Sequence, residues 1–261
     1  DLVKRYNDLS ELNTAMVPEL TQLPYSPFDY SRRSTTPVKN IGGKQVPVVI
    51  ADLSHLSNIK TSDLVAIGYT YDAATDKWAI SDAAADYVFI GHTPLDFNLP
   101  GTLSIIANPA VCSIANNTEK YHPILDAASY MALDAKHPQL NFVQIDCYSD
   151  LSPIADELLL QIAKDESVVF CLSSRCKNAM QAVRRMAIKL MQLDIHQPII
   201  LVTDSQWKTT DEHLIHFAIE TGALLLEGIG DGICLGLSKD AYDASVNGSN
   251  VSGRNYFNNA S

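Results

Sequence analysis

Short apolar runs recur at regular intervals from residue 46 onward, and this pattern constrains the fold more than any other feature of the chain. Each run is six residues long and mostly apolar rather than alternating, as strands of a parallel sheet covered on both faces require. Parallel strands need crossover connections, so the pattern predicts an α/β protein. The last of the eight runs is the weakest: 46–51, 86–91, 103–108, 142–147, 167–172, 198–203, 223–228 and 232–237.

Amphipathic segments between the later runs predict helices over 152–165, 176–193 and 211–222. Gly222 is expected to end the last of these helices. Earlier in the chain only 121–133 has a clear helical pattern. Eight strands separated by helices favour a (β/α)8, TIM-barrel-like single domain with degenerate early helices. A doubly wound open parallel sheet is the alternative.

The local composition of the sequence divides the chain into three parts. Residues 1–45 are polar and rich in turn-forming residues, so they predict an N-terminal segment outside the repeated pattern. Residues 46–237 carry the predicted barrel. Residues 238–261 are polar again and predict a linker.

Acidic residues outnumber basic ones, 30 to 19, which leaves a formal net charge of −11. Such a surface repels phosphate backbones and anionic lipids, so we expect neither nucleic acid nor a membrane as a partner. One stretch is cationic, because only Asp29 opposes Arg32, Arg33, Lys39 and Lys44 there. It is either a local phosphate site or, as is favoured, a solvated loop in contact with a neighbouring segment.

Five cysteines are spread along the chain, mostly within apolar runs. They are typical of buried thiols in a reducing compartment, and we expect a cytoplasmic protein. Cys171 and Cys176 form the closest pair, with no further cluster to complete four ligands, so no metal site is predicted.

Polar side chains follow several of the predicted strands, where the active sites of barrel enzymes are found. Converging carboxylates there can bind a metal or act as acid and base. They can also simply cap the next helix, which is favoured because no His or Lys joins them at a strand end. The candidates at this rim are Asp52, Asn108, Asp146, Asp204, Glu227 and Asp231.

The helix predicted over 211–222 places His213, His216 and Glu220 on one face. A site with two histidines and one carboxylate is geometrically conceivable, although a solvated polar face is favoured. The chain contains no G-x-S-x-G, H-E-x-x-H or P-loop sequence. The sequence therefore gives no support for the enzyme classes that these motifs define.

The glycines of GIGDG, residues 228–232, resemble a phosphate loop at first sight. They lack the G-x-G-x-x-G spacing and precede a predicted strand rather than a helix, and Asp231 would repel an anion. We therefore expect a tight turn between the last two strands, where two backbones pass closely.

Three segments carry a family resemblance: YSPFDYSRRSTTPVKNIGGKQVPVVIADLS (25–54), ETGALLLEGIGDGICL (220–235) and NYFNNAS (255–261). The chain resembles the inserted middle domain of the three-domain, plant- and Bacteroidetes-type 4-hydroxy-3-methylbut-2-enyl diphosphate synthase. The resemblance implies a reductive step of isoprenoid synthesis. In that step 2-C-methyl-D-erythritol 2,4-cyclodiphosphate becomes hydroxymethylbutenyl diphosphate at a [4Fe–4S] cluster supplied by ferredoxin or flavodoxin.

The family's substrate barrel and its Cys-Pro-x-Cys-Gly-Arg element do not occur in this sequence, so no catalytic or cluster residue is carried over. The resemblance therefore implies an inactive fragment without a cofactor of its own, a spacer that positions the flanking substrate barrel and cluster domain. Two alternatives remain open. One is a free-standing barrel enzyme or small-molecule binder that uses the rim carboxylates. The other is a docking surface for the electron donor, with Tyr30, Arg32, Arg33 and Lys39 as contacts.

Overall fold

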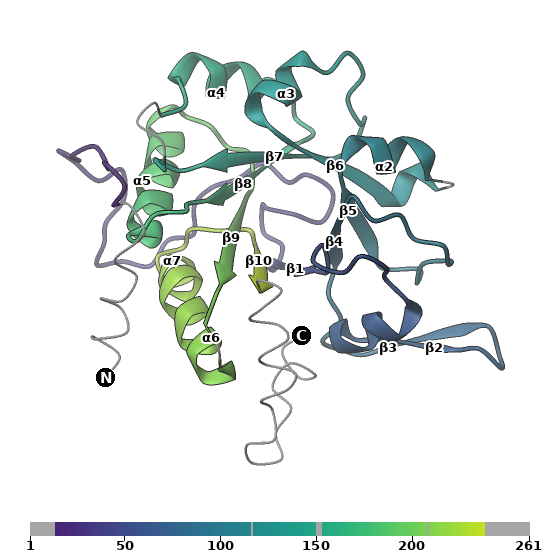
Figure 1. Cartoon of the computed structure of the whole chain (residues 1–261). Helices are drawn as coiled ribbons and strands as arrows, with labels where there is room; N and C mark the ends of the chain where they lie inside the picture. The colour runs from purple at the N-terminus through teal and green to yellow at the C-terminus, as the bar shows by residue number, and fades with distance from the viewer. Residues whose placement is uncertain (1–13, 116, 150–152, 208, 238–261) are drawn as a thin grey trace.

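The computed structural model describes residues 14–115, 117–149, 153–207 and 209–237. Eight parallel strands close into a barrel with helices on its outside (Figure 1). The predicted (β/α)8 barrel is confirmed, and the open sheet is wrong. In barrel order the strands are β1 (Val48–Asp52), β4 (Tyr87–Gly91), β5 (Ser104–Ala107), β6 (Tyr121–Asp126), β7 (Asn141–Asp146), β8 (Val168–Ser173), β9 (Ile199–Ser205) and β10 (Gly232–Leu237).

The first strand closes the barrel, because β1 pairs with the last strand on one side and with β4 on the other. Val48 pairs with Gly232, and Ile50 pairs with Tyr87. No strand of this barrel is left with an unpaired edge, so its backbone groups are satisfied without an outside partner.

Helices follow the later strands and are short or absent early in the chain. The first crossover has a 3-10 helix, η2 (Thr61–Ile67), and a hairpin of β2 (Tyr69–Asp72) and β3 (Lys77–Ile80) outside the barrel. The predicted weakness of the early helices is thus confirmed. The remaining helical elements are α2 (Pro109–Ile114), η3 (Thr118–Lys120), α3 (Ala127–Ala132), α4 (Asp156–Ile162), α5 (Ala179–Gln192), α6 (Thr210–Phe217), the π-helical turn η4 (Ala218–Gly222) and α7 (Ala223–Leu226).

Two predicted elements are wrong. The helix expected over 121–133 is strand β6 for its first six residues, and Asp126 then caps α3 by accepting from the Ser129 amide at 2.9 Å. Strand and helix follow each other without a turn, so their patterns merge. The strand expected over 223–228 is the end of a helix, because leucine favours helix where no β-branched residue competes.

Side chains that point into the barrel form one apolar core, and those that point outward pack under the helices. The largest outer cluster joins strands β7 to β9 with α4 and α5. Val38 and Ile41 of the N-terminal segment belong to the inner core and lie at the amino ends of the strands. The inner core also contains Val48, Ile50, Tyr87, Ile106, Leu140, Phe142, Val169, Cys171, Ile200 and Cys234.

Residues 14–45 are tied to the barrel along their length. The Ala15 amide donates to Asn178 Oδ1 at 2.7 Å at the start of α5, and the Arg33 amide donates to the Gly228 carbonyl at 2.8 Å. Because α5 begins after the carboxyl end of β8, the described chain starts and ends at the same end of the barrel (Figure 1). The linker predicted over 238–261 lies outside the described residues.

Candidate functional site

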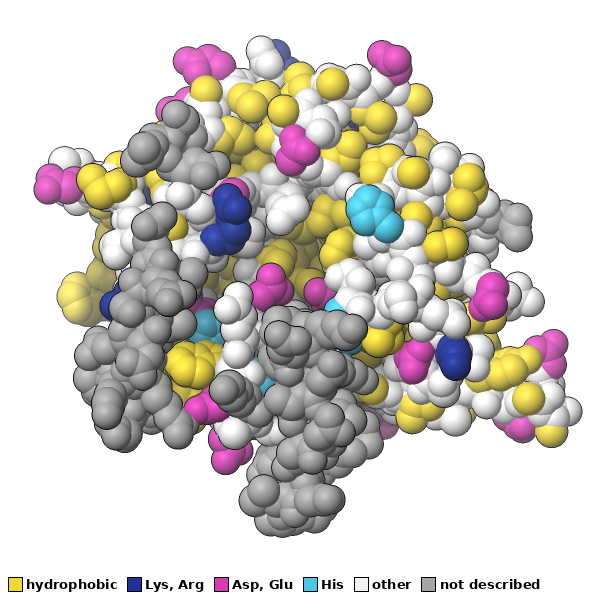
Figure 2. Space-filling model, in the orientation of Figure 1, with side chains coloured by type: hydrophobic (Ala, Val, Ile, Leu, Met, Phe, Trp, Pro, Cys, Tyr) yellow, Lys and Arg dark blue, Asp and Glu magenta, His cyan; other side chains and the backbone are white. Residues whose placement is uncertain are grey.

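A cavity of about 1180 Å³ opens at the carboxyl ends of β7, β8 and β9, between α5 and α6. Figure 2 shows this face hollowed, with hydrophobic side chains in the floor and charged side chains at the edges. The apolar floor combines strand and helix residues, namely Leu172, Met180, Val183, Leu201 and Leu224. A floor of this kind suits the apolar part of a small molecule.

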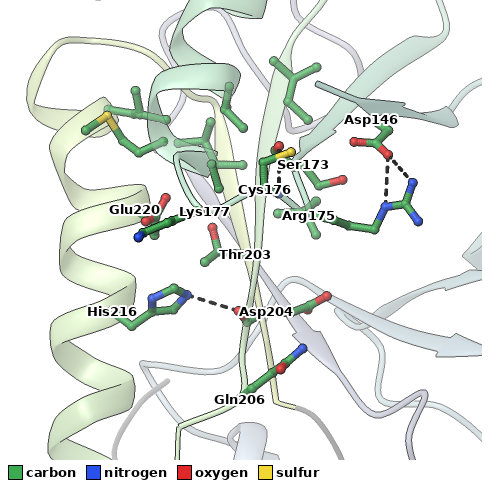
Figure 3. Close-up of a pocket in the computed structure, with 18 of the residues that line it drawn as sticks. Asp146, Ser173, Arg175, Cys176, Lys177, Thr203, Asp204, Gln206, His216 and Glu220 are labelled. Carbon is green, nitrogen blue, oxygen red and sulfur yellow. Dashed lines mark hydrogen bonds and ion pairs between the residues drawn. The ribbon is translucent and has the colours of Figure 1, made fainter. Parts of the chain in front are cut away.

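Polar side chains from three strands and one helix surround the cavity (Figure 3). The strands place them because each one ends there, and the loop after β8 adds two cations. The labelled lining residues are Asp146, Ser173, Arg175, Cys176, Lys177, Thr203, Asp204, Gln206, His216 and Glu220.

The positive charge of Arg175 is opposed by a carboxylate. Its Nη2 and Nε lie 2.8 and 3.1 Å from Asp146 Oδ2, and Ser149 also donates to Asp146. The guanidinium is largely exposed, so this pair adds little to stability. Lys177, the other cation of the lining, has no carboxylate of the described residues at ion-pair distance.

Asp204 and Asp52 share the mouth of the barrel. Burial, and then the nearby Asp52 carboxylate, raise the pKa of Asp204. Gly236 of β10 makes room for both acids, because a Cβ there would lie 3.0 Å from Asp52 Oδ2 and closer still to Asp204. A carboxyl group with a raised pKa is suited to donate a proton or a hydrogen bond.

The polar face of α6 is turned toward the cavity, so the predicted solvated face is wrong. His213 is 1% exposed and lies 2.7 Å from Ser205 Oγ, and Glu220 is 6% exposed. His216 Nε2 lies 3.1 Å from the Asp204 carbonyl. The helix packs against a polar barrel mouth rather than an apolar sheet. Its polar side therefore faces inward, opposite to the usual orientation of a surface helix. Burial lowers the pKa of His213, so this ring is neutral near pH 7.

Four of the six predicted rim residues lie where expected, at the carboxyl ends of strands. Asp52 Oδ1 accepts from the Ser54 amide at 2.8 Å, and Asn108 precedes α2. Asp146 and Asp204 line the cavity. The positions predicted for Glu227 and Asp231 are wrong, because residues 223–226 are helical and both acids therefore lie before β10, at the opposite end.

Asp231 and Glu227 instead hold the N-terminal segment. Asp231 is 2% exposed and accepts from Arg32 Nη2 at 3.0 Å, from Thr35 Oγ1 at 3.1 Å and from the Ile199 amide at 2.9 Å. Glu227 accepts from Arg184 Nε at 2.8 Å and from Tyr25 at 3.3 Å. These hydrogen bonds and ion pairs connect segments that are far apart in the sequence.

The GIGDG turn brings two backbones together, as predicted, although it joins a helix to a strand. Gly228 and Gly230 have φ values of +78° and +116°. A Cβ on Gly228 would lie 2.8 Å from Arg32 Cα. Only glycine combines this dihedral with so close an approach.

The cationic stretch is mostly engaged within the fold. Tyr30 is 71% exposed, but Arg33 is 8% exposed and donates to the carbonyls of Ile195 and Gln197. Lys39 Nζ lies 3.3 Å from His122 Nε2. The predicted partner contact at Arg33 is therefore wrong, because the guanidinium is enclosed and not accessible to a partner.

The five cysteines are free, and four are buried. Burial raises the pKa of Cys171 to about 12 and that of Cys112 to about 11, so both are protonated thiols at neutral pH. Within the described residues, no group of three or more His, Cys, Asp or Glu side chains is arranged to hold a metal ion. This part of the chain does not fit an iron–sulfur cluster, which needs clustered thiolates.

Sequence reasoning missed the cations and the aromatic residue of the cavity, namely Arg175, Lys177 and Trp207. The available signal was the position of Arg175 and Lys177 directly after a predicted strand. His216 and Glu220 were noticed, but their direction depends on which side of the helix meets the barrel.

Comparisons with known proteins point to one enzyme. Over 207 residues the chain is 28% identical to a protein of Parabacteroides distasonis named 4-hydroxy-3-methylbut-2-en-1-yl diphosphate synthase (flavodoxin), which covers 78% of this chain. A protein of the same name from Bacteroides thetaiotaomicron is 26% identical over 255 residues, or 88% of this chain. The chain is similar to a segment of that synthase.

The chain spans 29% and 35% of the lengths of these two relatives. No protein-family profile matches it, and no solved structure matches it. Within the described residues, no helix is both long and apolar enough to cross a membrane.

Proposed function

We propose that this chain is an inserted domain of a 4-hydroxy-3-methylbut-2-en-1-yl diphosphate synthase, a reductase of isoprenoid synthesis. The observation that carries the proposal is the alignment of 78% and 88% of the chain with about a third of each synthase. The parent enzyme would convert 2-C-methyl-D-erythritol 2,4-cyclodiphosphate with a [4Fe–4S] cluster outside these residues. The relatives' names supply flavodoxin as the electron donor, and ferredoxin is the alternative.

The domain would act as a structural spacer that positions the substrate barrel and the cluster domain of one polypeptide. Its closed barrel has its own core and needs no partner to satisfy its strands. Asp146 is engaged by Arg175, and Asp52 by the Ser54 amide. These contacts suit a scaffold and leave the chemistry to the flanking domains.

Co-expression of two complete polypeptides tests this role, one with an inactive substrate barrel and one with an inactive cluster domain. A spacer that lets one chain close on itself predicts little activity in the mixed dimer. Efficient restoration of activity in the mixed dimer would show that domains of different chains meet, and would refute closure within one chain.

The cavity at the barrel mouth supports a second candidate, the binding of a small molecule. Its lining has four acidic side chains, Asp146, Asp204, Glu212 and Glu220, and two cationic ones, Arg175 and Lys177. The balance of charge around the apolar floor therefore favours a ligand with an apolar body and a cationic head group.

Trp207 lines this cavity, and the chain's other tryptophan, Trp78, lies on the β2–β3 hairpin. In a Trp78→Phe background, titration with hexylamine is expected to change Trp207 fluorescence, whereas hexanoate of the same chain length is not. Asp204→Asn should weaken the hexylamine response, and the exposed Asp134→Asn should not. Equal responses to amine and acid would refute a cation-selective site.

A further inference from the structure

The two cations of the barrel-mouth cavity place a further condition on its ligand. Arg175 and Lys177 lie on the loop after β8 and line the cavity. Arg175 is opposed by the Asp146 carboxylate at 2.8 Å, whereas no carboxylate of the described residues lies at ion-pair distance from the half-buried Lys177. A ligand whose only charge is a cation would therefore meet a like charge in this cavity.

The position of Lys177 in the chain directs its side chain into the cavity. It follows the buried Cys176 and comes shortly before α5, which supplies Met180 and Val183 to the apolar floor. Figure 3 shows the Lys177 side chain extending from its loop toward the helical segment that carries Glu220. Its ammonium group is therefore placed to contact a bound molecule.

The order of residues along the strands places charge at the mouth of the cavity and apolar groups deeper in it. On β9, Leu201 precedes Asp204 by three residues, and both line the cavity. A strand rises about 3.3 Å per residue, so Leu201 lies about 10 Å deeper than Asp204. On the neighbouring strand, Leu172 likewise precedes Lys177. Both charges of a matching ligand therefore lie at the same end of its apolar body.

We propose that the cavity binds an aliphatic zwitterion whose ammonium group faces Asp204 and whose neighbouring carboxylate binds Lys177. α-Amino acids with long aliphatic side chains are the corresponding chemical class. The proposal names the ligand of the second candidate function and rests on that function. Lys177 would select the carboxylate, while the aliphatic chain would lie on the apolar floor.

Ligands that differ by one charged group test this proposal. 2-Aminoheptanoate is hexylamine with a carboxylate added to the carbon that carries the amine, and heptanoate is the same acid without the amine. Binding is followed by Trp207 fluorescence in the Trp78→Phe chain. 2-Aminoheptanoate is expected to bind about tenfold more tightly than hexylamine, a gain typical of one charge-assisted hydrogen bond. Heptanoate is not expected to respond.

The isomer 7-aminoheptanoate tests where the two charges lie. It carries the same groups at opposite ends of the chain, so it cannot place both at the mouth while its body lies on the floor. We expect it to bind no more tightly than hexylamine.

Substitutions of Lys177 test the residue that selects the carboxylate. Lys177→Gln is expected to abolish the preference for 2-aminoheptanoate and to bind hexylamine more tightly, because a like charge is removed. Lys177→Arg keeps the charge and is expected to keep the preference. Lys44→Gln is the control, because Lys44 is exposed and does not line the cavity.

Equal affinities for hexylamine and 2-aminoheptanoate in the chain with Lys177 would overturn the proposal. A preference that survives in Lys177→Gln would overturn it too, and so would tighter binding of 7-aminoheptanoate than of 2-aminoheptanoate. In each of these cases the binding of hexylamine would still support the second candidate function. No Trp207 response to either hexylamine or 2-aminoheptanoate would refute both that function and this proposal.

Discussion

Neighbouring glycines in the last helix and turn have opposite structural roles. Gly222 has φ −61° within the helix, and an added Cβ would meet no atom within 4 Å. Gly222→Ala is therefore expected to raise the free energy of unfolding by about 0.5–1 kcal/mol. Gly228→Ala, with φ +78° and Arg32 Cα 2.8 Å away, should lower it by at least about 2 kcal/mol. Urea unfolding of both variants measures the two changes in the free energy of unfolding. Changes of the same sign would contradict the opposite roles of the two glycines.

His122 makes stability depend on pH. The ring is fully buried, and burial followed by the Lys39 charge lowers its pKa to about 3. In the unfolded chain the pKa is about 6.5. Between these values only the unfolded chain binds the proton, so the stability contributed by neutral His122 is complete above pH 6.5. It falls by about 1.4 kcal/mol per pH unit as the solution is acidified toward pH 3.

The wild-type advantage over His122→Gln is thus expected to shrink by about 2 kcal/mol between pH 7 and pH 5. Urea unfolding at the two pH values measures this difference. His92→Gln is the control, because His92 is exposed. An advantage that does not change with pH would show that His122 takes up a proton in the folded state.

At the scale of elements, the N-terminal segment is fastened to the barrel by Arg33. Burial lowers the pKa of this guanidinium to about 10, so it remains charged at neutral pH while donating to the carbonyls of Ile195 and Gln197. Arg33→Ala is expected to lower the free energy of unfolding by about 3 kcal/mol and to speed proteolysis within 14–45.

Arg175→Ala is the matched control, because its side chain is 76% exposed and its ion pair with Asp146 is solvated. We expect a change within about 0.5 kcal/mol. Equal losses in the two variants would mean that burial of Arg33 contributes no stability beyond that of a surface charge.

Sequence reasoning identified elements well where one periodicity ran for long enough. Seven of the eight barrel strands follow apolar runs, and α5 follows the longest amphipathic stretch. It failed at 121–126, where a strand passes straight into a helix, and at 223–226, where a leucine run is helical. In both places local composition suits either structure, and the pairing of distant strands decides between them.

The candidate site was harder to predict than the fold for a related reason. Asp146 and Asp204 were found because they end recognisable strands. The directions of His216 and Glu220 were not, since the usual rule places the polar side of a helix in water. That rule fails where the barrel mouth presents Thr203 and Ser205 to the helix.

At the scale of the whole molecule, barrel closure and the β2–β3 hairpin should contribute very differently to cooperativity. Thr70 and Ala79 are cross-strand partners, so residues 71–78 can be replaced by Asn-Gly. This variant is expected to keep a single thermal transition. A chain that ends at Asp231 loses β10, the partner of both β1 and β9, and should lose cooperative unfolding.

Far-UV circular dichroism during heating measures both transitions. A sharp transition in the chain ending at Asp231 would show that seven strands suffice. A broad transition in the hairpin variant would show that the hairpin belongs to the same cooperative unit.

The described chain starts beside the beginning of α5 and ends with β10, both at the carboxyl end of the barrel. Polypeptide joined to both of these ends would therefore leave the barrel from the same side. The two points where the described chain begins and ends are separated by the width of the barrel mouth and not by the height of the barrel. Loops at the opposite end could then lengthen or shorten without moving these two points relative to each other.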